Sequence, residues 1–97
     1  MLTELLTLPG VVEEMSLGSR FGVMAYHGGN LEVGTDRIAD AVAERTGASR
    51  YVVRQPDDLR WHIPSRHFRP DESEQLAAFL SHVDEVVTIH GATELGV

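Results

Sequence analysis

The sequence predicts one small α/β domain over residues 1–97, with a mixed, largely parallel sheet flanked by helices. Two apolar runs, residues 21–26 and 85–89, are typical of buried strands. Helical patterns lie between them, and this alternation favours a sheet whose strands have parallel neighbours. The chain is 42% hydrophobic and 24% charged, which is ordinary for a globular domain.

The first half of the chain is predicted to hold four elements: a helix over 2–7, strands over 11–15 and 21–26, and a helix over 35–46. Pro9 and Gly10 end the first helix. Thr35 is a suitable N-cap for the second helix, and Gly47 is a natural C-terminal stop.

The second half is predicted to hold a strand over 51–53, a weaker strand over 60–64, a helix over 71–83 and a strand over 85–89. Asp71 and Glu74 form a capping-box pattern at the start of the helix. In the weaker strand His62 alternates with Trp61 and Ile63, so we interpret it as facing the other side of the sheet. Because the chain stops straight after the last strand, we expect a truncated form, the N-terminal part of a longer domain.

Composition excludes several classes of function. The absence of Cys excludes disulfides, thiolate nucleophiles and Cys-ligated zinc. A net charge of −7 disfavours nucleic-acid binding. No apolar run approaches the roughly 20 residues that cross a bilayer, and the N-terminus lacks the basic segment of a secretory signal. We therefore expect a cytoplasmic protein that binds neither nucleic acid nor membrane.

All eight basic residues are arginine, and five of them fall within twenty positions: Arg50, Arg54, Arg60, Arg66 and Arg69. Genomic composition bias is one explanation. The other is that guanidinium groups grip carboxylates or phosphates better than ammonium groups do.

The two apolar strands end alike, in His27-Gly28 and in His90-Gly91. If the strands are parallel neighbours, about 4.8 Å apart, both imidazoles share one crevice at the carboxyl edge of the sheet. Glu32 follows His27 across a glycine-containing loop and offers a third ligand. Two imidazoles and a carboxylate form the open ligand set of a catalytic zinc site. The alternative is that each histidine is only a polar residue at a sheet margin.

Other histidines are weaker candidates. His67 lies in a loop, where it would hydrogen-bond substrate or steady an oxyanion, or would simply be a surface residue. His82 falls in the last turn of a helix, where its positive form suits the dipole. We assign no catalytic role to His62 or His82.

The segment 27–35, with its HGG, Glu32 and Gly-Thr helix entrance, resembles the phage-type poly-γ-glutamate hydrolase family. Residues 65–68 are similar to that family's histidine-phenylalanine loop, and residues 86–91 to its second metal strand. The resemblance spans about residues 10–92, roughly the N-terminal half of the family's domain. It implies a zinc-carboxypeptidase-like α/β fold, hydrolysis of γ-linked glutamate polymers or similar acidic peptides, and a phage-related setting with release by lysis.

By position, the resemblance implies that Zn²⁺ is held by His27, Glu32 and His90 and that His67 lines the site. An acidic polymer would give Arg66 and Arg69 carboxylates to bind. The family takes its general base from a later part of the domain, and here Glu94 is the carboxylate that follows His90. The resemblance therefore leads us to expect zinc binding with impaired hydrolysis. The alternative is a non-catalytic α/β module that binds zinc or an anion, or that self-associates through an exposed sheet edge.

Overall fold

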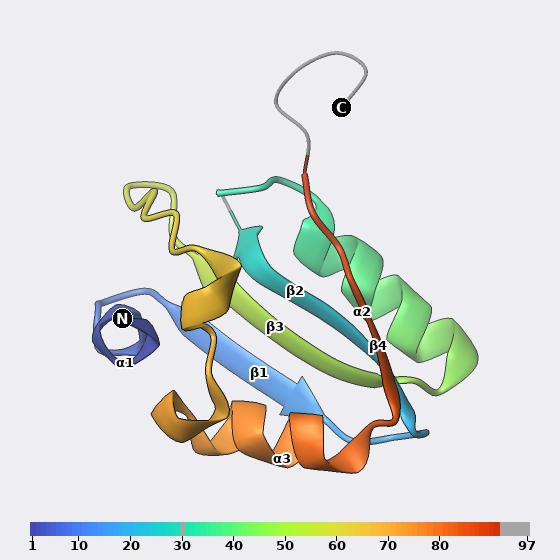
Figure 1. Cartoon of the computed structure of the whole chain (residues 1–97). Helices are drawn as coiled ribbons and strands as arrows, with labels where there is room; N and C mark the ends of the chain where they lie inside the picture. The colour runs from blue at the N-terminus through green and yellow to red at the C-terminus, as the bar shows by residue number, and fades with distance from the viewer. Residues whose placement is uncertain (30, 92–97) are drawn as a thin grey trace.

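A computed structural model describes residues 1–29 and 31–91 of the chain. The elements in chain order are α1 (Leu2–Leu6), β1 (Val12–Ser16), β2 (Phe21–Gly29), α2 (Thr35–Thr46), β3 (Ser49–Gln55), the 3₁₀ turns η1 (Ser65–His67) and η2 (Pro70–Glu72), α3 (Glu74–His82) and β4 (Glu85–Thr88) (Figure 1). None of the helices in this described part is long and apolar enough for a membrane span.

The four strands form one sheet in the order β1-β3-β2-β4. β1 is antiparallel to β3, whereas the β3–β2 and β2–β4 pairs are parallel. The predicted mixed, largely parallel sheet is thus confirmed, and the two strands that end in His-Gly are parallel neighbours.

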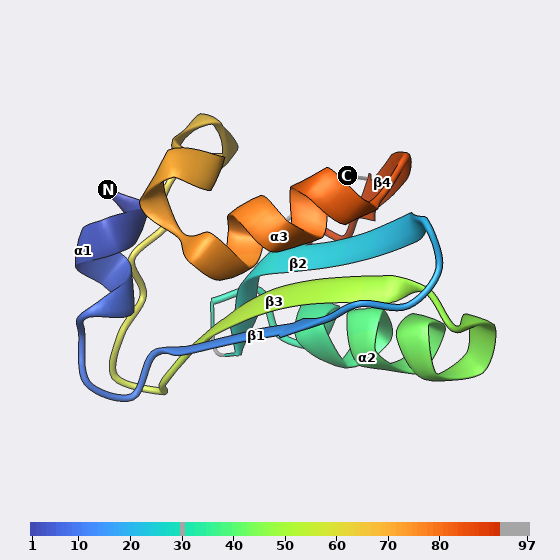
Figure 2. The same cartoon turned by 90° about the horizontal axis from the view of Figure 1, so that it is seen from below.

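Helices cover both faces of the sheet: α3 lies on one side and α2 on the other (Figure 2). One core cluster, on the α1 and α3 side, contains Leu2, Leu5, Met24, Tyr26, Tyr51, Val53, Ile63, Phe68, Leu76 and Phe79. The other, beneath α2, contains Val23, Ala25, Ala39, Ala48 and Val52. β2 supplies alternate residues to both clusters, which is why its sequence is apolar without interruption.

Residues 60–64 do not form the predicted strand. This extended segment is held instead by the Gln55 side chain, whose Nε2 donates to the Trp61 carbonyl over 2.7 Å and whose Oε1 accepts from the Trp61 amide over 2.9 Å. One amide side chain thus replaces a strand partner, and the segment crosses the carboxyl end of the sheet without joining it.

The predicted helix over 71–83 starts later than its capping-box pattern indicates. Residues 70–72 form the turn η2, and α3 begins after Ser73. Ser73 is extended (φ −154°, ψ 127°), and its Oγ accepts from the Leu76 amide over 3.1 Å. A serine in this conformation satisfies a free amide of the first turn, so it is Ser73 that caps the helix.

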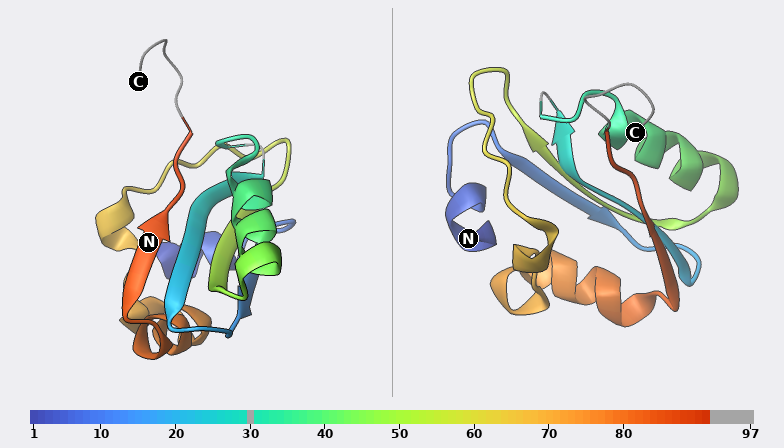
Figure 3. Two further views of the ribbon diagram at one scale, coloured as in Figure 1. Left: turned by 90° about the vertical axis from the view of Figure 1, so that its right-hand side faces the viewer. Right: turned by 45° about the horizontal axis from the view of Figure 1, so that its top comes forward.

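β4 is an exposed edge strand, not the buried strand that its apolar sequence predicted (Figure 3). Val86 and Val87 are 37% and 46% exposed. β4 pairs with β2 along Phe21–Met24 only, and α2 packs on β2 and β3. Strand β4 therefore has an unpaired edge within the described part of the chain.

A network of ion pairs ties α2 to the sheet. Arg54 on β3 donates from Nε to Asp36 over 2.7 Å and from Nη2 to Asp40 over 2.6 Å, and it also pairs with Glu14 on β1. Arg50 pairs with the same Asp40 and Glu14. Two of the five clustered arginines are therefore bound by the chain's own carboxylates and are not available to an acidic ligand.

Replacing Asp36 with Asn is expected to destabilise the fold in a pH-dependent way. Burial would raise the pKa of Asp36, but hydrogen bonds from Arg54 and from the Gly29 backbone, together with the charge of Arg54, outweigh it and hold the pKa below its ordinary value. The charged carboxylate thus stabilises the fold above the unfolded pKa, about 3.9, and this contribution is lost as the pH falls through the folded pKa. Asp36→Asn should cost about 1.5–3 kcal/mol at pH 7.

Urea unfolding at pH 7 and pH 3 measures this effect. The difference between Asp36→Asn and wild type should shrink at pH 3, whereas Asp58→Asn, at an exposed position, should change little at either pH. A deficit of equal size at both pH values would show that the charge of Asp36 is not what stabilises the fold.

Candidate metal centre

The carboxyl end of β2 is irregular, and this irregularity sets the direction of His27. Ala25 pairs with Val52, but Gly28 pairs with Arg54, so β2 carries one residue more than β3 over this stretch. Such a bulge changes the side to which a side chain points. The rings of both Tyr26 and His27 consequently contact Phe68, with centroids 4.4 and 5.8 Å away.

The two glycines after His27 allow close packing at this strand end. A Cβ on Gly28 would lie 2.8 Å from both the Val53 carbonyl oxygen and the Asp36 Cβ. A Cβ on Gly29, which has φ +69°, would lie 2.3 Å from the carbonyl oxygen of Gln55. Only glycine fits at these positions, so the pair serves close packing at the strand end.

His27 is buried, and its Nε2 lies 2.6 Å from the Ile63 carbonyl oxygen. Burial lowers the pKa of His27, so the ring is neutral near pH 7. Since a carbonyl can only accept, the proton sits on Nε2 and Nδ1 carries a lone pair. Nδ1 has no hydrogen-bond partner, although it lies 3.4 Å from Glu32 Oε2.

Glu32 lies in the loop between β2 and α2, and this loop is fixed at both ends. The Glu32 amide donates to the His27 carbonyl over 2.9 Å, and the Glu32 carbonyl accepts from the Thr35 hydroxyl over 2.8 Å. Burial alone would raise the pKa of Glu32, but hydrogen bonds from the Gly91 amide and from His62 outweigh it and lower the pKa. The side chain is therefore a carboxylate near pH 7.

His90 follows β4 and reaches the other oxygen of the same carboxylate. Its Nδ1 lies 3.7 Å from Glu32 Oε1, and its Nε2 shares a 3.3 Å hydrogen bond with the Tyr26 hydroxyl. The His27 and His90 ring centroids are 6.0 Å apart. The structure thus brings together all three predicted ligands, and that they bind metal stays a prediction.

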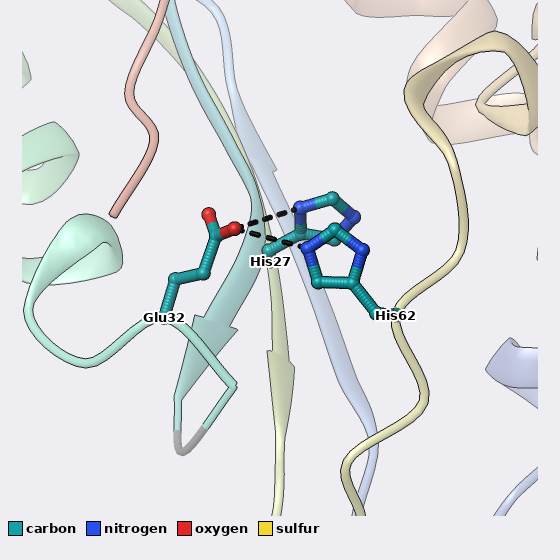
Figure 4. Close-up of side chains that lie close together, drawn as sticks. All are labelled: His27, Glu32 and His62. Atoms are coloured by element: carbon teal, nitrogen blue, oxygen red, sulfur yellow. Dashed lines mark hydrogen bonds and ion pairs between the residues drawn. The ribbon is translucent and has the colours of Figure 1, made fainter. Parts of the chain in front are cut away.

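The sequence interpretation missed His62. Its Nε2 lies 3.1 Å from Glu32 Oε2, and its ring centroid is 4.0 Å from that of His27. Ligand atoms of His27, Glu32 and His62 all lie within 4.8 Å of one another. Figure 4 shows His62 reaching from its own segment toward Glu32, so the prediction that it faces the other side of a sheet is wrong.

These side chains suit a divalent cation. The lone pair of His27 Nδ1 faces a carboxylate oxygen with no proton between them, an arrangement that is repulsive unless a cation lies between the two atoms. Metal-bound histidines commonly donate their other N–H to a backbone carbonyl, as His27 does to Ile63. Imidazole and carboxylate together are donors that Zn²⁺ accepts.

The remaining predicted residues that the structure describes lie outside this cluster. His67 ends η1, one residue before Phe68, and within the described residues its side chain makes no hydrogen bond to the cluster. Arg66 is exposed, and Arg69 pairs with Asp71 over 3.2 Å at the surface. Glu94 lies outside the described residues.

Comparison with known proteins gives one match. The profile of the poly-gamma-glutamate hydrolase family matches residues 7–96, which includes every residue of the cluster. No curated protein and no solved structure matches the chain. Because the profile covers nearly the whole length, the chain belongs to the poly-gamma-glutamate hydrolase family.

Proposed function

We propose that this chain is a zinc-dependent hydrolase that cleaves γ-glutamyl amide bonds in poly-γ-glutamate or similar acidic peptides. The observation that carries the proposal is the buried, unpartnered Nδ1 of His27, which faces the Glu32 carboxylate in a member of this family. His27, Glu32 and His90 would hold the ion.

When bound, Zn²⁺ supplies a Lewis acid that polarises a carbonyl and lowers the pKa of water. Other residues of the chain orient the side chains that would bind the ion. Ile63 fixes the tautomer and plane of the His27 ring, and the Gly91 amide orients the Glu32 carboxylate. In the reaction one water adds across the amide, so that the acyl carbon gains the hydroxyl and the leaving nitrogen gains a proton.

Substrate contacts are proposed for the segment that follows His62. Arg66 is exposed, and the surface pair of Arg69 with Asp71 is weak enough to exchange for a substrate carboxylate. We propose His67 as a hydrogen-bond donor to substrate and Glu94 as the general base. A polymer of glutamate, with one free carboxylate in each unit, suits these guanidinium groups.

Replacing Glu32 with Gln is expected to abolish both zinc binding and hydrolysis. The amide keeps the size of the side chain but removes the negative charge between His27 and His90. After metal-free purification and reloading, zinc content is measured for each chain, and release of glutamate oligomers from the polymer is followed by chromatography. Glu44→Gln, an equal change at an exposed position on α2, should leave both properties intact.

Two results would refute the proposal. One is a wild-type chain that takes up no zinc after reloading. The other is hydrolysis by Glu32→Gln at the wild-type rate.

A further inference from the structure

The two oxygens of Glu32 have different neighbours. Oε1 faces His90 and accepts from the Gly91 amide, whereas Oε2 faces His27 and His62. A cation next to Oε2 would therefore meet His62 as well as His27. Two histidines and one carboxylate already supply the three protein ligands of a catalytic zinc site. A third histidine beside the same carboxylate therefore needs its own explanation.

The spacing at Oε2 fits shared coordination. Zinc ligands about 2.0–2.1 Å from a tetrahedral ion lie about 3.3 Å from one another. The distances from Oε2 are 3.4 Å to His27 Nδ1 and 3.1 Å to His62 Nε2. His62 is thus as well placed for a common ion as His27 is, and in the metal-free chain its Nε2 donates to the oxygen next to which that ion would lie.

The position of His62 distinguishes it from the two buried ligands, His27 and Glu32. Its side chain is 58% exposed, close to the 50% of His90, whereas His27 is 3% and Glu32 11% exposed. It comes from the segment 56–64, which pairs with no strand of the described part, and it stands over the His27 ring at a centroid distance of 4.0 Å (Figure 4). His62 therefore lies, with His90, on the solvent side of the cluster.

We propose that His62 is a fourth protein ligand, which closes the set formed by His27, Glu32 and His90. The proposal rests on the zinc site of the proposed function and adds its regulation. Four protein ligands are typical of structural zinc, whereas catalytic zinc keeps one position open. His62 must therefore leave the ion before substrate can bind. As a ligand it presents the Nε2 lone pair and carries its proton on Nδ1.

His62→Ala tests the proposal through metal affinity. Competition with a chromophoric chelator should show a loss of zinc affinity of at least the roughly 10–100-fold that follows removal of an outer-shell partner, because His62 is a direct ligand. His82→Ala is the matched control, because His82 is also on the surface but hydrogen-bonds to Gly18, away from Glu32. Since His62 is exposed, its removal leaves the core intact.

A second readout tests whether His62 closes the site. Each variant is loaded with Co²⁺, and its visible spectrum is recorded while azide is added. Wild type should show little change, because its four positions are filled, whereas His62→Ala should bind azide and shift its spectrum. At saturating zinc, His62→Ala should also hydrolyse polymer faster than wild type.

The outcomes separate this inference from the proposed function. Unchanged zinc affinity in His62→Ala overturns the inference, even when wild type hydrolyses the polymer. A loss of hydrolysis in zinc-saturated His62→Ala overturns it as well. Lower affinity and new azide binding, with no hydrolysis by any variant, would support His62 as a ligand and refute the proposed hydrolase.

Discussion

Replacing His27 with Gln is expected to remove zinc binding while the fold survives. A glutamine amide can still donate to the Ile63 carbonyl, which now accepts from His27 Nε2 over 2.6 Å. It cannot supply the Nδ1 lone pair that faces Glu32. Because a direct ligand is lost, zinc affinity should fall by more than the roughly 10–100-fold that follows loss of an outer-shell partner. Chelator competition measures the affinity, and circular dichroism checks the fold.

His82→Gln is a closely matched control for this change. His82 Nε2 also bonds to a backbone carbonyl, that of Gly18, over 2.7 Å. The two substitutions therefore remove the same ring and keep the same type of hydrogen bond, but only His27 lies beside the Glu32 carboxylate. Equal zinc affinity in the two variants would refute the assignment of His27 as a ligand.

Replacing Gly29 with Ala is expected to cause a large loss of stability. The added Cβ would lie 2.3 Å from the Gln55 carbonyl oxygen and 2.8 Å from the Gln55 nitrogen, and φ is +69°. The left-handed backbone costs about 1–2 kcal/mol and overpacking about 1–3 kcal/mol. Together they predict a loss of about 2–5 kcal/mol, measured as the shift in urea unfolding. Zinc affinity should fall too, because the loop to Glu32 starts here.

Gly47→Ala separates the two causes. Gly47 has a similar φ of +74°, but no atom lies within 4 Å of its added Cβ. This variant should therefore show the backbone cost alone, about 1–2 kcal/mol. If both variants lose the same stability, the close approach of Gln55 to β2 is not what requires glycine at position 29.

Most of the fold could be predicted from local patterns. The helix over 35–46 was predicted with its observed bounds, and Gly47 forms its C-terminal cap with φ +74° as expected. The prediction that Thr35 is the N-cap is wrong, because Gly34 holds that position and the Thr35 hydroxyl donates to the Glu32 carbonyl. Strands 21–26 and 85–89 were recognised by their apolar runs, and their parallel pairing is confirmed. The helix cap at Ser73 was missed because serine, aspartate and glutamate in one stretch offer several overlapping capping patterns.

Only the site residues near the ends of strands could be predicted from the sequence. His27 lies near the carboxyl end of β2, and His90 follows the carboxyl end of its parallel neighbour β4, so topology alone brings them to one edge. His62 was missed because its segment is ordered by the Gln55 side chain, not by strand pairing, and no periodicity reports such a contact. The bulge in β2 could not be predicted either, because an apolar run does not show that one of its residues lacks a partner in β3.

The edge strand β4 has a thermodynamic consequence for the centre. His90 is joined to the sheet by four residues that pair with β2 on one side, followed by the bond from the Ile89 amide to the Met24 carbonyl. Short edge elements open locally at low free-energy cost. A ligand that binds only the closed form stabilises that form by linkage. Metal binding at the centre and local unfolding of β4 are therefore coupled equilibria. The apparent metal affinity of the chain includes the free energy needed to keep β4 paired with β2.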